Sequence, residues 1–337
     1  MKARRWSSLA LVATMSSGFI LSALPAAAAE TDPVLDALER VALADEDGSR
    51  AVLSDLAEPV VSGPDEVART EHEGITITLP VDPAQGIDLS SDAGSVTVGL
   101  PFADAASEAQ EIAASVIAYE NHNDTTTVPI LKDDGSVQIT TVIDSSVAPT
   151  SYSYPLDIPT GATAELVDGV VAIRSADGSF LAGISPAWAT DAAGEAVPTH
   201  YVLEGNTLTQ IVEHTSDFQY PVVADPWLGN ALISTTWVTS YTGYWAVNVI
   251  PTSWGRTYSG TPTHAAHVAE LKTKLGTNSW RVDTLDGTIR EQFLCHVFGN
   301  AFEPGTYNME SNRKSVYWPL QLNLIDRCNP IIITTTT

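Results

Sequence analysis

Short alternations of apolar and polar residues fill the chain between residues 74 and 214 and predict β-strands throughout this region. The predicted strands span residues 75–79, 95–100, 115–120, 126–131, 136–143, 151–156, 170–174, 179–184, 200–203 and 207–213. The connecting segments contain Asp134–Gly135, Asp168–Gly169, Asp177–Gly178 and Gly205–Asn206, pairs that tight hairpins favour. About ten short strands at this spacing predict an antiparallel sandwich or barrel.

Helical spacing replaces this alternation in residues 30–73. Asp32 followed by Pro33 is a typical helix start. The apolar residues that come next at helical spacing are Val34, Leu35, Leu38, Val41 and Ala42. A second helix is expected at residues 51–57, which makes residues 30–73 a helical N-terminal segment. The alanine-rich run at residues 104–114 predicts one further helix, inside the β-rich region.

A proline-flanked stretch, residues 220–227, interrupts the chain. Pro221 and Pro226 cannot donate to a sheet ladder, and each favours extended backbone in the residue before it. We therefore expect a stiff linker here, between an acidic β-rich domain at residues 74–219 and a second domain at residues 228–337.

The second domain has mixed periodicity and is predicted to be a small α+β domain. Strands are expected at residues 232–239 and 244–250, and helices at residues 262–275 and 289–297. Trp254–Gly255–Arg256 predicts a tight turn between these strands and helices.

Charge divides the chain at the same place. Residues 30–226 contain 34 acidic and five basic residues, whereas residues 227–337 contain seven acidic and eight basic residues. The negative electrostatic field of the acidic domain repels nucleic acid and anionic membranes. We therefore expect neither as its partner. Solubility outside the cell is the simpler explanation of the charge, and we favour it over a specific cationic ligand.

The first 29 residues have the features of a secretory signal peptide. Lys2, Arg4 and Arg5 precede an apolar run at residues 9–24, and Ala27–Ala29 forms a small-residue cleavage site. The arginine pair leaves the twin-arginine route open, but the general secretory route fits the following serines better. No later stretch approaches the roughly 20 apolar residues of a membrane helix, so we expect a secreted, extracellular protein.

The two cysteines, Cys295 and Cys328, both lie in the second domain. In an exported chain they are expected to form a disulfide, which would stabilise the domain by roughly 3 to 4 kcal/mol. A catalytic thiol is the alternative, but it needs a protected setting that export does not offer.

Four short motifs in the second domain carry a family resemblance. They are Trp254–Gly255–Arg256, Cys295–His296, Asn308–Met309–Glu310 and Cys328–Asn329–Pro330. Together they resemble an uncharacterised family of exported actinobacterial domains, domain of unknown function 2599, over about the last hundred residues. Two positions depart from the family pattern, Tyr307 in place of a tryptophan and Arg313–Lys314 in place of arginine–proline. The stretches Trp188–Ala192, Val197–Thr199 and Tyr220–Pro226 are similar to a leader region that precedes several different C-terminal domains in secreted actinobacterial proteins. The resemblance implies an extracellular address and this architecture, but no reaction.

The first of two functional hypotheses is a binding module for an envelope glycan or protein. It rests on aromatic residues at Trp227, Trp237, Tyr241, Tyr244, Trp245 and Trp254. Trp245, Trp254 and Arg256 are the candidate binding residues. The simpler explanation of most of these aromatics is core packing.

The second hypothesis is a secreted hydrolase or effector toxin. Its candidate site residues are His296, with Glu310 or Arg313 as partner, because Glu291 would point elsewhere on an ideal helix. No serine elbow, zinc helix or paired carboxylate accompanies them, and a structural role for His296 is the simpler interpretation. His264 and His267 are three residues apart, but no third ligand has a metal-site spacing, so we expect neither metal nor cofactor.

Overall fold

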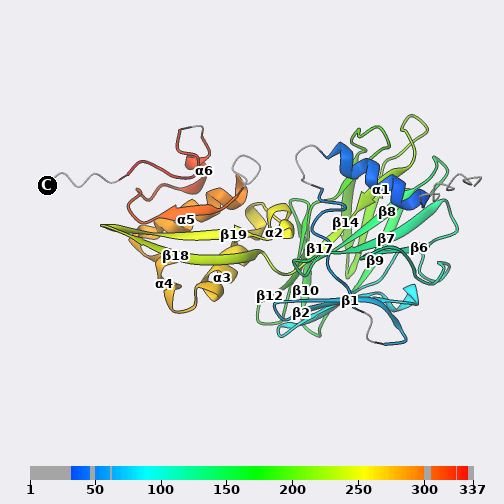
Figure 1. Ribbon diagram of the computed structural model, residues 1–337, viewed down its shortest axis with the longest axis horizontal. Coiled ribbons are helices and arrows are strands. Elements are labelled where there is room, and N and C mark those ends of the chain that lie inside the picture. Colours follow the sequence, from blue (N-terminus) through cyan, green and yellow to red (C-terminus); the bar gives the residue numbers. More distant parts are fainter. Residues whose placement is uncertain (1–31, 46–49, 61–62, 300–304, 324, 333–337) are drawn as a thin grey trace, which may run out of the picture. The chain divides into compact units, whose positions relative to one another are not determined.

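The computed structural model of the protein describes residues 32–45, 50–60, 63–299, 305–323 and 325–332 (Figure 1). Antiparallel sheets dominate the N-terminal part, and the C-terminal part combines a small sheet with short helices. The predicted fold class is therefore confirmed. The predicted signal peptide lies outside the described residues. No helix in the described part of the chain combines the length and apolarity that crossing a membrane requires.

Seven antiparallel strands form the first sheet, in the order β1-β2-β3-β4-β9-β15-β14. They are β1 (Glu66–His72), β2 (Ile75–Pro80), β3 (Ile87–Ser91), β4 (Gly94–Val98), β9 (Ser151–Asp157), β14 (Thr199–Glu204) and β15 (Thr207–Val212). Burial alternates along β9, where Tyr152, Tyr154 and Leu156 are buried and their neighbours are exposed. One face of this sheet therefore points into a core, as the sequence pattern predicts.

Ten strands form the second sheet, with the main order β10-β11-β12-β17-β8-β7-β6-β5, in which β16 also pairs with β8 and carries β13. They are β5 (Gln110–Ala113), β6 (Val116–Glu120), β7 (Thr125–Leu131), β8 (Val137–Ile143), β10 (Thr163–Val167), β11 (Val170–Arg174), β12 (Phe180–Ile184), β13 (Trp188–Thr190), β16 (Val222–Asp225) and β17 (Trp227–Gly229). Every residue of β7 and β8 is buried, so the centre of this sheet is covered on both faces.

One apolar core joins the two sheets. Ile77, Leu89 and Tyr154 of the first sheet belong to the same buried cluster as Ile139 and Ile173 of the second. This arrangement is an antiparallel β-sandwich, which confirms one of the two predicted architectures.

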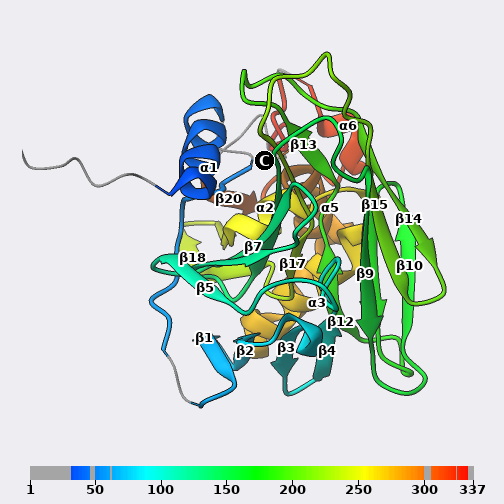
Figure 2. The same cartoon turned by 90° about the vertical axis from the view of Figure 1, so that its right-hand side faces the viewer.

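Helix α1 (Pro33–Ala44) covers the second face of the ten-stranded sheet (Figure 2). Asp32 caps it, because its carboxylate accepts a hydrogen bond of 2.9 Å from the backbone N–H of Val34. Leu38 and Val41 are buried against strand residues that include Val128. The first predicted helix is thus confirmed.

The second predicted helix, at residues 51–57, is wrong, and β1 also lies within the segment 30–73 that was expected to be helical. Residues 51–57 form turns around the buried ammonium of Lys132. The ammonium donates hydrogen bonds to the backbone carbonyls of Ala51, Val52 and Ser54. Three carbonyls that converge on one ammonium do not share the common direction along the axis that a helix requires.

The alanine-rich run at residues 104–114 is not a helix either. It forms turns followed by the edge strand β5, which pairs with β6. Before β5, the N–H of Ala109 donates to the carbonyl of Val81, so sheet contacts override the helical propensity of alanine.

The expected linker at residues 220–227 belongs to the sandwich. Strand β16 pairs with β8 and is buried throughout, and β17 pairs with both β8 and β12. Pro221 and Pro226 stand just outside the ends of β16, where no ladder donor is needed, and the carbonyl of Pro226 accepts from the N–H of Ile139. The β-rich region therefore runs from β1 to β17 without a connector.

The C-terminal module, from β18 onward, is a three-stranded antiparallel sheet with helices on one face, in the strand order β18-β19-β20. Its strands are β18 (Ile233–Tyr241), β19 (Tyr244–Pro251) and β20 (Tyr307–Glu310). Its helices are α2 (Ser253–Thr257), α3 (His264–Leu275), α4 (Trp280–Asp283), α5 (Thr288–Phe298) and α6 (Trp318–Gln321). Short 3-10 turns are η1 (Pro83–Gln85) in the sandwich and η2 (Thr261–Thr263), η3 (Gly276–Asn278) and η4 (Leu285–Gly287) here.

The predicted strands and helices of this module are confirmed as β18, β19, α3 and α5. The predicted tight turn at residues 254–256 is instead part of helix α2. Val247, Val249 and Met309 of the sheet share a buried cluster with Leu271 and Phe293 of the helices, which defines the core face of the sheet. The opposite face is called the open face below.

Candidate functional site

His296 lies in the core of the C-terminal module, on helix α5. Its ring stacks on that of Tyr307, with centroids 5.1 Å apart and planes 10° from parallel. Neither ring nitrogen hydrogen-bonds to a described residue. Burial lowers the pKa of His296 to about 4, while the nearby backbone of Asn308 acts to raise it. The ring is therefore neutral near pH 7.

Glu310 and Arg313 bind each other and not His296. The guanidinium of Arg313 donates to the Glu310 carboxylate and, at 3.1 Å, to the carbonyl of Pro330. The Glu291 carboxylate accepts from the N–H of Trp318 at 2.8 Å. These residues fasten the C-terminal segment to the module, and the structure does not assemble them with His296 into an acid–base pair.

The predicted disulfide between Cys295 and Cys328 is present. The two Cα atoms are 5.3 Å apart and both side chains are buried. It joins helix α5 to the segment after α6, so neither sulfur is a free thiol.

Trp254, a candidate binding residue, is fully buried. Its backbone N–H donates to the carboxylate of Asp134 in the β7–β8 turn at 2.9 Å, and its indole N–H donates to the carbonyl of Trp227 at 3.1 Å. Its ring stacks on Tyr258 at a centroid distance of 4.6 Å. The ring packs directly on Gly229, where a Cβ atom would lie 2.5 Å from Cδ2 of Trp254. Trp254 is thus a packing residue and cannot contact a ligand in this state.

Arg256, a second candidate, is also held within the module. Its guanidinium carbon lies 5.7 Å from the ring centroid of Tyr307, and it donates to the carbonyl of Gly305 at 2.8 Å. Arg256 and His296 therefore share Tyr307 as a neighbour, which the sequence did not predict. The contacts are those of a brace for the start of β20.

The two histidines of helix α3 are buried. The ring nitrogens of His267 lie 3.2 Å from the carbonyl of Thr263 and 3.3 Å from that of Gly255, while His264 packs edge-on against Trp318. Burial lowers both pKa values to about 4. Within the described residues, no group of three or more His, Cys, Asp or Glu side chains is placed to hold a metal ion.

Aromatic side chains gather on the open face of the sheet. Because Val247 and Val249 point into the core, their neighbours Ala246 and Asn248 point to the opposite face, as do the cross-strand partners Thr239 and Trp237. Trp237 is 41% exposed. The amide of Asn248 donates to the hydroxyl of Thr239 at 3.0 Å and to the carbonyl of Trp237 at 3.3 Å, which fixes a polar stripe beside the indole.

Two tyrosines extend this face to the tip of the hairpin. Tyr241 pairs with Tyr244 across the β18–β19 turn, and their rings stack with centroids 4.6 Å apart and planes 12° from parallel. Tyr241 is 49% exposed. Trp237 and this tyrosine pair therefore form one row on the open face, four residues apart along β18. The sequence singled out these aromatics but not their common face, which results from the strand register.

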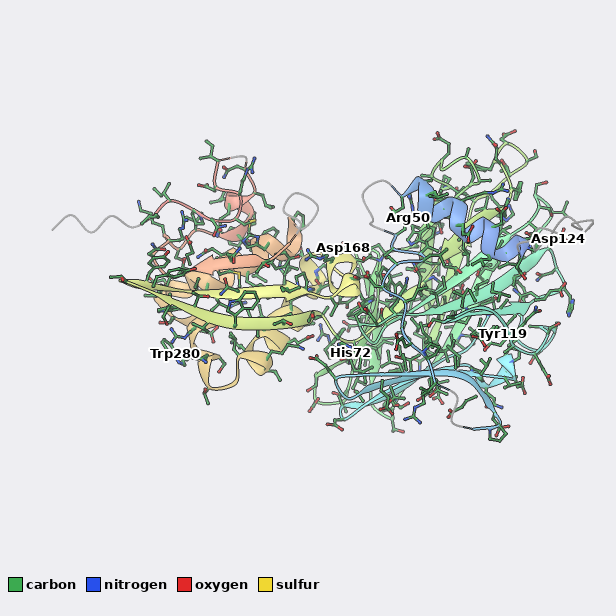
Figure 3. All side chains as sticks on the ribbon, in the orientation of Figure 1. Arg50, His72, Tyr119, Asp124, Asp168 and Trp280 are labelled. Carbon is green, nitrogen blue, oxygen red and sulfur yellow. A yellow bond between two sulfur atoms is a disulfide. The ribbon has the colours of Figure 1, made fainter. Side chains whose placement is uncertain are left out.

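Trp245, the third candidate binding residue, lies on the other face of the hairpin and is partly exposed. The guanidinium carbon of Arg281 lies 4.5 Å from the ring centroid of Trp245 and 4.6 Å from that of Trp280. Trp280, on α4, is 55% exposed (Figure 3). Sequence reasoning missed Trp280 and Arg281; their adjacency in the sequence was the available signal.

Three hollows are lined by described residues, and none of the candidate catalytic and binding residues lines them. One of about 620 Å³ is acidic and includes Glu108, Glu120, Asp124 and Asp144. Another, of about 570 Å³, includes Glu270, and a third, of about 480 Å³, lies on the sandwich. None of the three contains His296 or Trp254.

No curated relative matches the sequence. The C-terminal region does match a family model, over residues 232–331, which span the module from the start of β18 to the segment beyond Cys328. This confirms the resemblance carried by the Trp254, Cys295, Asn308 and Cys328 motifs. The C-terminal module of this protein is thus similar to the family described as Protein of unknown function (DUF2599).

Proposed function

We propose that the protein acts outside the cell as a binding protein, and that the open face of the β18–β19–β20 sheet contacts the ligand. The observation that carries this proposal is the row formed by exposed Trp237 and Tyr241, with Tyr244 stacked on Tyr241 and partly exposed. Buried Asn248 holds Thr239 beside this row. Aromatic side chains that only pack the hydrophobic core are buried, whereas binding surfaces use exposed aromatics as rigid anchors.

The chemistry of this face favours a neutral glycan of the cell envelope. Flat aromatic rings offer a stacking surface for the C–H faces of sugars, and the partly exposed hydroxyl of Thr239 beside them offers a hydrogen bond to a sugar hydroxyl. Strands β18 and β19 contain no charged residue, and Glu310, the charged residue of β20, is paired with Arg313. No unpaired charge on these strands therefore selects a charged ligand. A row of rings along one strand suits an extended chain better than a single sugar.

A hydrolase or toxin receives no comparable support. His296 is neutral and buried, and Glu310 is paired with Arg313. Export is supported by the charged and apolar pattern of residues 1–29 and by the disulfide between Cys295 and Cys328.

Co-sedimentation with insoluble cell-wall polysaccharides and isolated envelope fragments tests the proposal. We expect the wild-type protein to bind at least one of them. Trp237→Ala and Tyr241→Ala should each weaken binding about tenfold, which corresponds to about 1.4 kcal/mol. The matched control is Tyr317→Ala, which removes an aromatic side chain that is 63% exposed elsewhere on the module.

Two results would overturn the assignment. If all three variants lost binding equally, non-specific adsorption by exposed aromatic side chains, and not this face, would hold the polysaccharide. Binding that protease treatment of the envelope abolishes, but glycosidase treatment does not, would identify a protein partner instead.

A further inference from the structure

Strand β18 is an edge strand that lacks the usual protection against pairing. It spans nine residues, Ile233–Tyr241, and stands at one end of the strand order, so no strand among the described residues pairs with its outer edge. Natural edges are guarded by lysine, proline, inward charges or bulges. β18 has no charge and no proline, and its one irregularity is a register shift between Ile233 and Thr235, at its beginning.

The sequence of this edge reads almost the same in both directions. It runs Ser-Thr-Thr-Trp-Val-Thr-Ser over residues 234–240, with Trp237 at the centre. Thr235 mirrors Thr239, and the serines at the two ends mirror each other. The remaining pair, Thr236 and Val238, has nearly the same shape. Such a strand presents the same side chains to a second copy of itself running in the opposite direction.

We propose that two copies of this protein pair through β18, antiparallel, across a two-fold axis at Trp237. In a two-fold contact, residue i of one copy meets residue j of the other and the reverse also holds, which a palindromic strand satisfies. Thr235 then lies opposite Thr239 of the second copy, a favourable cross-strand pair. The two three-stranded sheets become one six-stranded sheet, with the two Trp237 rings side by side on its open face.

Charge favours a second copy at this edge over the rest of the surface. The chain carries a net charge of −25, and 34 of its acidic residues precede residue 227. Two such molecules repel each other through their sandwiches, so an association must use a neutral patch. β18 is neutral and lies in the module with seven acidic and eight basic residues from residue 227 onward. A foreign peptide would gain the same backbone hydrogen bonds but no benefit from the palindrome.

A charge-swap experiment tests this register, with mass measured by sedimentation equilibrium over a concentration series. The wild-type protein should show a concentration-dependent dimer. Thr235→Lys with Thr239→Lys places lysine opposite lysine twice, and the corresponding double glutamate variant places glutamate opposite glutamate. Each variant alone should have half the wild-type mass. An equimolar mixture of the two should recover the dimer mass, because every lysine then faces a glutamate.

The control adds the same charge to an interior strand. Ser151→Lys with Ser153→Lys changes two exposed residues of β9, which already has a partner on each side, and it should remain dimeric. The Asn248 to Thr239 hydrogen bond is lost in both double variants, so the mixture also controls for that loss. A monomeric wild type at all concentrations would overturn the proposal. A mixture that stays monomeric would overturn this pairing, as would a β9 variant that is monomeric.

Discussion

His296 stacks on Tyr307 at a centroid distance of 5.1 Å, while both of its ring nitrogens lie buried without a hydrogen-bond partner among the described residues. The contact is one of flat surfaces. An unpaired buried nitrogen costs stability, so an apolar ring should serve as well at this position.

Replacing His296 therefore separates a packing role from a chemical one. We expect His296→Gln to lower the free energy of unfolding by about 1 to 3 kcal/mol, because it loses the ring and buries an amide. His296→Phe keeps the stack and should change stability by less than about 1.5 kcal/mol. Urea unfolding measures both. If the glutamine variant were as stable as wild type, His296 would not be needed for packing, and a chemical role would again be the better explanation.

The same histidine predicts a loss of stability in acid. Its pKa is lowered to about 4 in the folded protein, below the ordinary value of 6.5, by burial. A lowered pKa means that the folded state resists protonation of His296. The stability that the neutral ring contributes is therefore fully present above about pH 6.5 and is lost as the pH falls towards 4. Urea unfolding of wild type and His296→Phe across this range should show a smaller acid loss in the phenylalanine variant. Identical acid profiles would contradict this.

Asp225 predicts the opposite trend in the sandwich. Burial raises the pKa of Asp225 to about 7, although a 3.0 Å hydrogen bond from the Gln138 amide favours the ionised form. A raised pKa means that stability is full below the ordinary value near 3.8 and declines as the pH rises through 7. Asp225→Asn cannot ionise, so it should gain stability relative to wild type on going from about pH 5 to about pH 8. Parallel melting curves at both pH values measure this, and an unchanged difference would refute it.

The disulfide should carry a large share of the module's stability. Cys295 and Cys328 are 33 positions apart, and closing a loop of that size stabilises a fold by about 3 to 4 kcal/mol on the chain-entropy scale. The double Cys→Ser variant should unfold at a correspondingly lower urea concentration. Intact protein should take up no thiol-alkylating reagent until it is both denatured and reduced. Alkylation without reduction would contradict the bond.

The junction between sandwich and module should resist protease. Strands β16 and β17 are buried, and Trp254 packs against Gly229 with no space for a side chain. We expect native wild-type protein to show no cleavage within residues 222–229. Gly229→Ala should lower stability by about 1 to 3 kcal/mol through overpacking and should expose this stretch to cleavage. Rapid cleavage of the native wild-type protein in this stretch would instead support the linker predicted at residues 220–227.

The sequence predicted those elements that depend on their own residues. The alternation in β9 and the helical repeat of α1 each place one face in a core, so local pattern and structure agree. Where the outcome depends on distant residues, the pattern is insufficient. The turns at 51–57 exist because Lys132 binds their carbonyls, and β16 is a strand because β8 lies beside it.

The candidate site shows the same limit. The sequence alone does not show which of Trp254 and Trp237, in the same tryptophan-rich segment, is buried. The first is buried because Gly229 leaves room for its ring, and the second is exposed because strand register turns it away from Val247 and Val249. The cysteine pair was predictable, because two cysteines in an exported chain have one simple pairing.

The ammonium of Lys132 holds the carbonyl of Val52 from 80 positions further along the chain. A ribosome therefore finishes the segment after α1 long before it supplies the residue that anchors it. Until Lys132 is made and the β7–β8 hairpin closes, these carbonyls lack the ammonium that holds them in the folded protein. Any truncated product that ends before residue 132 would have no anchor for the turns at residues 51–57, and it would also lack Val142 and Val223, which share a buried cluster with α1.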